Sequence, residues 1–159
     1  MQHCTAGDYE DCRTVAYDAA YPDRNIETES AYDPAGHLVR VTNTLGVVTY
    51  YEYNTANRLV RTVENYDPGK AQNEEGLYNI TTRYAYDAAG NPVRVTDTLG
   101  MVTWTGYDAL GRVAAVTVNY TTTTPNPDPA TYNLVTAYGY DRAGNPVTTT
   151  NPLGIVTAN

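Results

Sequence analysis

The stretch AYDAAGNPVRVTDTLGMVT, residues 85–103, decides the fold because the chain carries it three times. AYDPAGHLVRVTNTLGVVT, residues 31–49, is identical to it at 14 of 19 positions, and GYDRAGNPVTTTNPLGIVT covers residues 139–157. The Tyr-Asp pairs inside the three copies lie 54 residues apart in both intervals, with no insertion or deletion between them. A fixed period of this length indicates a repeat architecture in which every unit has the same geometry.

A second tyrosine series divides each unit further. Tyr53 and Tyr107 also differ by 54, and they split the unit into intervals of 21 and 33 residues. The chain of 159 residues therefore contains about three units. We expect one continuous repeat domain made of a degenerate first unit at 1–48, a second unit at 49–102 and a third at 103–159.

Within a unit, the pattern is that of short strands joined by tight turns. Aliphatic or aromatic side chains recur at every second position in residues 84–86, 93–95 and 102–104, which is the period of a β-strand. An Asp that opens a turn can accept backbone N–H groups, and a Gly that closes it can adopt the left-handed conformation. This turn chemistry predicts hairpins at four Asp-Gly pairs: Asp33 and Gly36, Asp87 and Gly90, Asp108 and Gly111, Asp141 and Gly144. A Leu-Gly turn closes at Gly46, Gly100 and Gly154.

The composition agrees with this pattern. The chain has 16 Tyr, 25 Thr, one Trp, one Ser and no Phe, and Tyr and Thr favour a pleated, half-buried surface. We predict an all-β fold: a repeat array of antiparallel β-hairpins, two Tyr-Asp hairpins per unit, arranged as a solenoid, a spiral sheet or a rolled tube. Because neither face of a strand is strictly polar, the sheet should roll up, pack on another sheet or meet other chains.

The Tyr-Asp pair followed by two glycines resembles the YD-repeat, or Rhs-repeat, family. AYDAAGNPVRVTDTLG in particular is similar to a bacterial YD repeat almost letter for letter, and the resemblance covers roughly residues 31–157. It implies large β-sheet shells and spirals, as in bacterial Rhs toxins, insecticidal toxin complexes and teneurin adhesion proteins. In these proteins the repeats enclose a toxin or present a surface, and activity resides in attached domains. The resemblance therefore implies a structural role.

The charge of the chain excludes some partners. Its formal net charge is -8, so it gains nothing from counterion release on phosphates, and we expect no nucleic-acid binding. An anionic membrane surface would repel it, and no apolar run approaches the roughly 18 residues of a membrane helix.

We find no pattern that predicts catalysis or a cofactor. Ser30 and His37 could belong to a nucleophilic site, but their repeat-mates are Tyr84 and Asn91, so we interpret His37 as a turn residue. The carboxylates that open the turns could form an acid/base set or bind calcium. Turn capping explains every copy of them, and no calcium-loop motif is present. We therefore expect no enzyme activity, no cofactor and no metal.

Other groups of residues leave more than one interpretation. The tyrosines Tyr53, Tyr86, Tyr107 and Tyr140 predict an aromatic ladder across the strands, with a glycan-binding strip as the alternative. Asn79 and Asn119 each open a glycosylation sequon, and Thr121, Thr122, Thr123 and Thr124 form a run that could carry sugars. Cys4 and Cys12 could form a disulfide, within the chain or to a neighbouring one; a zinc site with His3 and inert thiols are the alternatives.

Two classes of function stay open. The first is a non-catalytic structural protein that builds a filament, sheath or shell, with β-strands pairing head to tail between copies. Residues 155–159 match the first half of a strand that elsewhere continues to Tyr-Asp, and Met1 falls at the phase of Thr55, so the two ends are in phase. The second is an adhesin-like module that binds glycans or another partner; the resemblance adds the shell fragment of an Rhs-type toxin.

The expected partners are copies of the chain itself or further repeats of a longer chain, with glycans as a further possibility. We expect a bacterial protein that works outside the cell or on its surface, although no secretion signal is visible in the sequence.

Overall fold

The computed structural model describes residues 28–122, 128 and 130–158. In this part of the chain, eleven strands form one sheet whose strand order is the same as the chain order, and every neighbouring pair is antiparallel. The prediction of an all-β array of antiparallel hairpins is confirmed. Apart from one short 3-10 turn, η1 (Glu74–Gly76), the described residues contain no helix, so none that could span a membrane.

The strands are short and recur with the sequence period. They are β1 (Glu29–Tyr32), β2 (Leu38–Thr42), β3 (Val48–Tyr53), β4 (Leu59–Glu64), β5 (Ile80–Tyr86), β6 (Pro92–Thr96), β7 (Val102–Tyr107), β8 (Val113–Val118), β9 (Leu134–Tyr140), β10 (Pro146–Thr150) and β11 (Val156–Ala158). Strands β3 and β7 start 54 residues apart, as do β4 and β8, β5 and β9, and β6 and β10. The division into units at 48 and 102 stays a proposal, because a continuous sheet has no internal boundary at which to place it.

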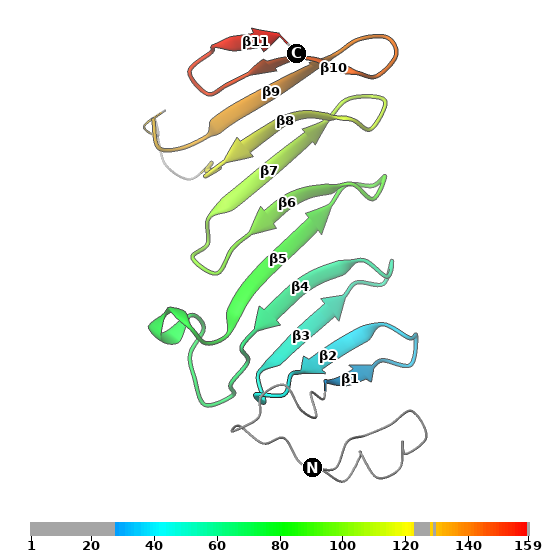
Figure 1. The fold of residues 1–159 in the computed structure, drawn as a ribbon, viewed down its shortest axis with the longest axis vertical. Helices are drawn as coiled ribbons and strands as arrows, with labels where there is room; N and C mark the ends of the chain where they lie inside the picture. Colours follow the sequence, from blue (N-terminus) through cyan, green and yellow to red (C-terminus); the bar gives the residue numbers. More distant parts are fainter. Residues whose placement is uncertain (1–27, 123–127, 129, 159) are drawn as a thin grey trace, which may run out of the picture.

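The turns separate onto two edges of the sheet. The five turns that begin at residues 33, 54, 87, 108 and 141 follow β1, β3, β5, β7 and β9, and Figure 1 shows all of them along one edge. We call this edge the YD rim. The opposite edge carries the short turns after β2, β6 and β10 and two long loops, residues 65–79 and 119–133.

Each hairpin of the YD rim contains a β-bulge next to its tyrosine. The register shifts between Ala85 and Tyr86, for example, and again between Gly106 and Tyr107. The glycine that closes the turn has a positive φ, such as 97° at Gly90, which a residue with a Cβ adopts at a cost. The sequence predicted a glycine in the left-handed conformation at this place, and the bulge beside it increases the local twist of the sheet.

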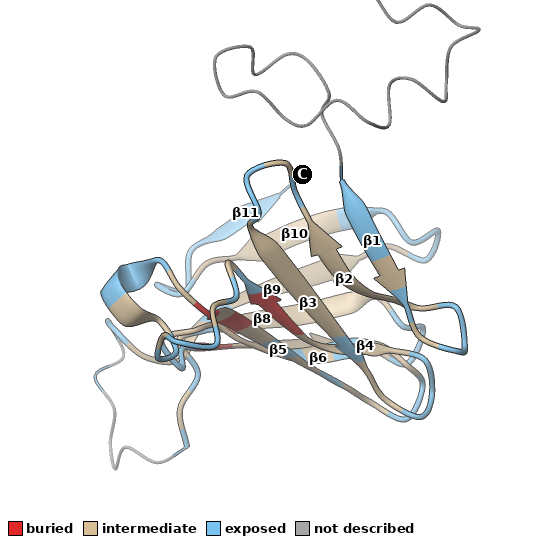
Figure 2. Cartoon of the chain, turned by 90° about the horizontal axis from the view of Figure 1, so that it is seen from below, coloured by how far each residue is buried: buried red, intermediate tan, exposed pale blue. Residues whose placement is uncertain are grey.

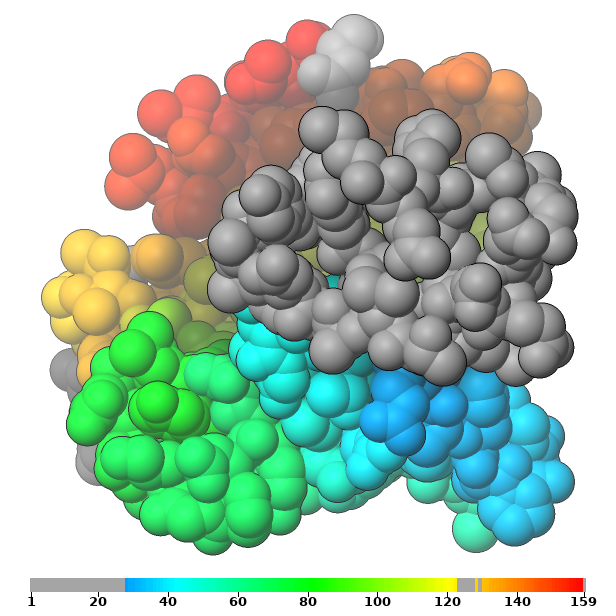
Figure 3. Space-filling model, turned by 60° about the horizontal axis from the view of Figure 1, so that its bottom comes forward, coloured from blue at the N-terminus to red at the C-terminus, as the bar shows by residue number. Residues whose placement is uncertain are grey.

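The sheet is twisted and curled but not closed. Seen along its long axis in Figure 2, it bends into an open trough with β4 to β6 at the bottom. Figures 1 and 3 place β1 and β11 at opposite ends of the molecule, and these two strands do not pair. Among the arrangements expected from the sequence, the structure is the spiral sheet.

The sheet is one layer thick and has little core. Val63 and Val102 are the only buried hydrophobic residues in the described part of the chain, and the other buried residues are polar (Thr62, Asn79, Thr81 and Thr117). The long loop after β4 supplies some of the cover, since Tyr66 packs edge-on against Tyr50, with ring centroids 4.8 Å apart. In Figure 3 the green segment of the chain, which includes this loop, forms a lobe at the lower left, on the side of the sheet opposite the YD rim. A sheet with so small a core depends on the hydrogen bonds between its strands and within its turns.

Candidate functional site

The YD rim is built from one turn that recurs with the same hydrogen bonds. Asp33 Oδ1 accepts the backbone N–H groups of Ala35 and His37, each at 2.9 Å. Asp108 Oδ1 accepts the corresponding pair in its own turn, and Asn54 Oδ1 shows that an amide oxygen can take the place of the carboxylate. The backbone N–H of the closing glycine donates to the carbonyl of the opening residue in each Asp turn, at 3.0 or 3.1 Å. These bonds satisfy the polar groups of the turn locally.

The Leu-Gly turns on the opposite edge are the same motif. Asn43 Oδ1 accepts the N–H groups of Leu45 and Val47, and Asp97 and Asn151 accept the corresponding pairs. The closing glycines have positive φ values of 76° at Gly46, 82° at Gly100 and 79° at Gly154. Sequence reasoning named these glycines but missed their partners, Asn43, Asp97 and Asn151. The signal was present, because all these turns read Asp or Asn, two residues, then Gly.

The fourth residue after the opening Asp is a second part of the motif that the sequence interpretation missed. Its side chain donates to the other carboxylate oxygen: His37 Nδ1 to Asp33 at 2.9 Å, Asn91 Nδ2 to Asp87 at 3.0 Å, and Arg112 Nε to Asp108 at 2.7 Å. Asn145 Nδ2 repeats the contact with Asp141 at 2.9 Å. We call these residues the +4 residues; Arg58 holds the same position after Asn54.

These contacts lower the pKa of the turn carboxyls. The side-chain hydrogen bond from His37 is the largest cause at Asp33, and the side-chain bonds from Asn91 and Asn145 are the largest at Asp87 and Asp141. At Asp108 the main cause is the backbone N–H of Arg112, and its guanidinium adds to the effect. In each case the donors favour the ionised carboxyl, so its pKa lies below the ordinary value.

The tyrosines of the Tyr-Asp pairs fix each hairpin to the one before it. The hydroxyl groups of Tyr86, Tyr107 and Tyr140 donate to the backbone carbonyls of Leu59, Pro92 and Val113 at 2.7, 3.0 and 2.8 Å. Each of these carbonyls belongs to the residue directly after a +4 residue. The contact therefore joins neighbouring hairpins along the YD rim.

The rings of three of the four tyrosines in the predicted ladder contact +4 residues. His37 stacks on Tyr53 with ring centroids 4.7 Å apart, and the guanidinium groups of Arg58 and Arg112 lie 5.1 and 4.4 Å from the ring centroids of Tyr86 and Tyr140. No stacked pair among these four tyrosines is present in the described residues. The ladder expected from the sequence thus takes a different form, in which the rings of Tyr53, Tyr86 and Tyr140 lie against the preceding turn.

The two asparagines of the predicted sequons, Asn79 and Asn119, lie at the bases of the long loops. The side chain of Asn79 is enclosed: its Oδ1 accepts from the N–H of Asp67, and its Nδ2 donates to the carbonyls of Asp67 and Lys70 at 2.9 and 2.8 Å. Asn119 Nδ2 donates to the carbonyl of Thr131, as Asn65 does in the preceding loop. Because a glycan would attach to the same Nδ2 atoms, these contacts oppose glycosylation of the folded chain at both positions.

We call Asn65 and Asn79 with their repeat-mates Asn119 and Asn133 the asparagine clasps. Within each pair, the backbone N–H of the second Asn donates to the carbonyl of the first, at 3.0 and 3.1 Å. All four have a φ between 48° and 54°, the left-handed conformation that Asn tolerates better than most residues. The 54-residue match of these asparagines was the signal for this role, whereas the sequon pattern pointed elsewhere.

Of the remaining predicted residues, only some are described. Thr121 lies next to the second clasp, where its N–H donates to Asn133 Oδ1, and Thr122 is exposed. Thr123, Thr124, His3, Cys4 and Cys12 lie outside the described residues. Ser30 is exposed on β1, and His37 is bound to Asp33, so the structure records no contact between Ser30 and His37. The described residues hold no group of three or more potential metal ligands.

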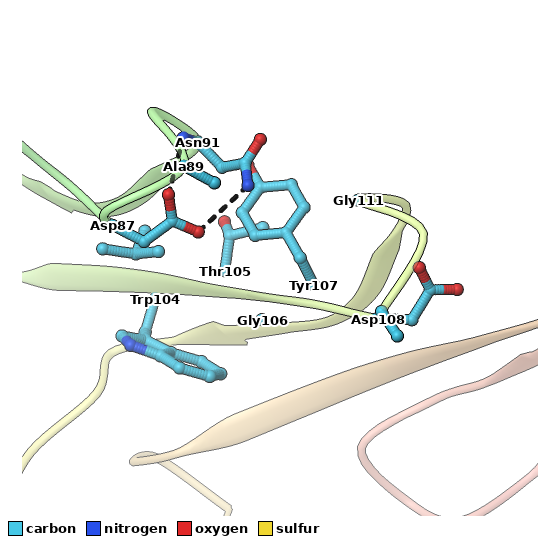
Figure 4. A pocket seen from close by; sticks show the side chains of 11 residues that line it. Asp87, Ala89, Asn91, Trp104, Thr105, Gly106, Tyr107, Asp108 and Gly111 are labelled. Atoms are coloured by element: carbon cyan, nitrogen blue, oxygen red, sulfur yellow. Dashed lines mark hydrogen bonds between the residues drawn. The ribbon is translucent and has the colours of Figure 1, made fainter.

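A hollow of about 420 Å³ opens on the YD rim between the turns that begin at Asp87 and Asp108. Figure 4 shows Thr105 and Tyr107 on one side of β7, beside the Asp87–Asn91 contact, and the Trp104 ring on the other side. The Trp104 ring lies against Gly106, where a Cβ would come within 2.7 Å of it. The hollow is therefore lined by Tyr107, Asn91 and the two turns, and also by Trp104.

Comparisons with known proteins agree with this geometry. The family model described as RHS Repeat matches residues 32–67, 79–100 and 86–124, just over half of the chain. No curated protein sequence matches.

Among solved structures, the crystal structure of TcdB2-TccC3 is similar at 22% identity and a TM-score of 0.61, over 79% of this chain and 6% of that one. The structure titled TcdB2-TccC3-Cdc42 gives 21% and 0.61, over 79% of this chain and 5% of that one. A Photorhabdus luminescens Tc holotoxin pore with a mutated TccC3 gives 21% and 0.59, over 78% and 5%. The chain thus spans only about a twentieth of the length of these neighbours, and at such identities the likeness shows the fold.

Proposed function

Because the chain belongs to the RHS repeat family, we propose that it is a non-catalytic wall segment of a β-sheet shell. It would work as part of a larger assembly, next to further repeats of a longer chain. Its task would be to separate the space on one side of the sheet from the space on the other.

The observation that carries this proposal is the single-layer sheet. Eleven strands in consecutive order form a curved surface, and only Val63 and Val102 are buried hydrophobic residues in the described part. A domain built around its own core packs two layers and buries far more apolar surface. The sheet instead takes its stability from strand pairing, turns and clasps, which suits a wall that can be extended by adding units.

The sheet also ends in an edge strand, β11, at which a further strand could be added. Within the described residues, β11 pairs on one side only, with β10. An edge strand with free N–H and C=O groups can pair with a further strand. We propose that the next repeat continues the spiral at this edge.

Assembly of separate copies into a filament is the second candidate. The same edge strand supports it, because it could pair with a second copy as readily as with a further repeat. A glycan-binding face has less support, since three of the four tyrosine hydroxyls donate to backbone carbonyls and three of the four rings contact +4 residues. For either candidate we propose a location outside the cell or at its surface.

Light scattering and negative-stain microscopy of the purified chain over a hundredfold range of concentration would test the proposal. We expect association through the sheet edge, giving curved particles if the edge builds shells and straight fibres of indefinite length if copies form filaments. The variant Val156→Lys with Ala158→Lys places two charges along β11 and should suppress association. Leu153→Lys, in the exposed turn before β11, is the matched control and should leave association unchanged. Monodisperse monomers at every concentration would contradict edge pairing.

A further inference from the structure

The hollow beside Tyr107 is open, whereas the equivalent positions beside the other three tyrosines are filled by the side chain of a +4 residue. At the turn before Tyr86 and at the turn before Tyr140, the +4 residue is an arginine whose guanidinium lies over the tyrosine ring. Before Tyr53 it is His37, stacked on the ring. Before Tyr107 it is Asn91, whose short side chain is used by Asp87. The hollow of about 420 Å³ lies at this turn.

The two arginines also show which groups a guanidinium uses at such a position. Arg58 Nη1 donates to the backbone carbonyl of Asp87 at 3.2 Å, and Arg112 Nη1 donates to that of Asp141 at 3.5 Å. These carbonyls also accept the N–H of the closing glycine of their turns, so each uses both lone pairs. A guanidinium over a tyrosine ring is held by the ring quadrupole as well.

The corresponding groups around the hollow are available. In the described residues, the carbonyl of Asp108 is recorded as accepting only from Gly111. A Cβ built on Gly90 or Gly144 would meet the guanidinium of Arg58 or Arg112 at 3.5 or 4.0 Å, whereas one built on Gly111 would meet nothing within 4 Å. The space that a guanidinium occupies at two turns is therefore empty at the third.

The charge around the hollow suits a cation. The carboxylate of Asp87 is bound by Asn91 but makes no ion pair within the described part of the chain, unlike that of Asp108, which pairs with Arg112 at 2.7 Å. Figure 4 shows Asp87 and Asn91 facing the same side of β7 as Tyr107. The chain as a whole carries a net charge of -8, which attracts cations and repels anions.

We propose that this hollow is a binding site for the guanidinium group of an arginine side chain from another polypeptide segment. The guanidinium lies over Tyr107 and donates to the carbonyl of Asp108, as Arg58 and Arg112 do for their neighbours. The site exists whether or not the sheet encloses anything, so it does not depend on the wall function.

A titration of the 159-residue chain with N-acetyl-L-argininamide, followed in 1H–15N spectra, tests the site. We expect saturable shifts of the amide signals of Asp108 and Gly111, and binding at least tenfold weaker for N-acetyl-L-citrullinamide, which has the same shape without the charge. Equal shifts with the two probes, or shifts spread evenly over all the Asp turns, would overturn the proposal.

Variants at the +4 position locate the site. Asn91→Arg fills the hollow with the chain's own guanidinium and should abolish the shifts. Asn91→His, which copies the contact that His37 makes with Tyr53, should weaken them and serves if the arginine variant does not fold. Asn145→Arg makes the same change at a turn with no following Tyr-Asp pair and should leave binding intact. Binding that persists in Asn91→Arg with unchanged affinity would place the arginine elsewhere and refute the assignment.

Sedimentation of the two arginine variants identifies the source of the arginine. Self-association that is lost in Asn91→Arg and kept in Asn145→Arg means that a second copy supplies it. Arginine binding without any effect on self-association means that a different segment does.

Discussion

At the scale of single residues, the repeat depends on an oxygen atom rather than on a charge. Asn54 accepts the backbone N–H groups of its turn at 2.9 and 3.0 Å, and Asp33 accepts those of its own at 2.9 Å. The difference between the two residue types lies in the second side-chain atom. In Asp it is an acceptor for the +4 residue, and that contact lowers the pKa of the carboxyl.

We predict that acid destabilises the chain through these carboxyls. The pKa of Asp87 and of Asp141 is lowered from 3.8 in the folded chain. A carboxyl with a depressed pKa contributes stability that is present above its unfolded value and is lost as the pH falls through the folded value. The thermal midpoint of the wild type, followed by circular dichroism, should therefore start to fall as the pH approaches 3.8 and continue to fall below it.

The double variant Asp87→Asn with Asp141→Asn separates charge from geometry. At neutral pH its midpoint should lie below that of the wild type, because the contact of the ionised carboxyl with the +4 residue is lost, but the turn itself should persist, because Asn54 already holds the same turn. Its midpoint should fall less than that of the wild type on acidification. Asp87→Ala with Asp141→Ala should be less stable at both pH values, since it removes the acceptor itself. Parallel acid curves for the wild type and the Asn variant would show that these carboxyls are not responsible.

At the scale of elements, the long loops differ from the short turns in how they close. A short turn satisfies its own backbone groups, whereas the loop of residues 65–79 is held at its base by the side chain of Asn79. Asn79 is only 9% exposed and has a φ of 52°. The position therefore needs both a buried amide that makes these hydrogen bonds and a residue that tolerates the left-handed conformation. The loop in turn places Tyr66 against Tyr50. The clasp is therefore coupled to the small core beneath it.

We predict that Asn79→Ala lowers the free energy of unfolding by about 1–3 kcal/mol, because the carbonyls of Asp67 and Lys70 lose their donor. A left-handed backbone adds roughly 1–2 kcal/mol for a residue with a Cβ that lacks the local hydrogen bonds of Asn. Urea unfolding measures both effects when Asn79→Gly is included, since glycine tolerates the conformation but does not restore the bonds. A glycine variant as stable as the wild type would mean that the clasp bonds contribute nothing.

The strands and turns could be predicted from the sequence, whereas the contacts between hairpins could not, because only the former depend on local patterns. Alternation along a strand and the Asp-to-Gly spacing of a turn are local, and residues 84–90 display both. The contact of Arg58 with Tyr86 joins residues 28 positions apart. It exists only because the sheet brings consecutive hairpins together in a particular register. The direction of curl likewise depends on the twist and bulges of all strands together.

At the scale of the whole molecule, the fold is a row of nearly equivalent strands, each paired with the strands next to it in sequence. Strand β4 contacts β3 and β5, and no strand pairs with one that is distant in sequence among the described residues. In such arrays stability is close to a sum of unit terms and interface terms. The sheet should therefore accept whole units, but not fractions of them, because side chains alternate between the faces and a slip of one residue exchanges them.

We predict that a second copy of residues 49–102, inserted after Val102, folds as four further strands in the same sheet. The junction keeps the phase, since Thr49 and Thr103 are equivalent. Each added interface should raise stability, and a gain of about 1 kcal/mol shifts the thermal midpoint of a chain of this size by about 2–4 °C. Small-angle scattering should show a longer particle with the same cross-section, because the spiral grows along its axis.

The matched control is an insertion one residue shorter, the same copy ending at Met101, which shortens the strand at the junction by one residue. The inserted copy then lacks the buried Val102, and the hydrogen-bond register set by the preceding turn places the side chains that follow the junction, such as Trp104 and Thr105, on the wrong faces. This variant should unfold at a lower temperature than the wild type, although its insertion is only one residue shorter than the one that should stabilise the chain. If both insertions stabilised the chain equally, length alone would explain the gain, and the exact 54-residue period would not be what lets the sheet extend.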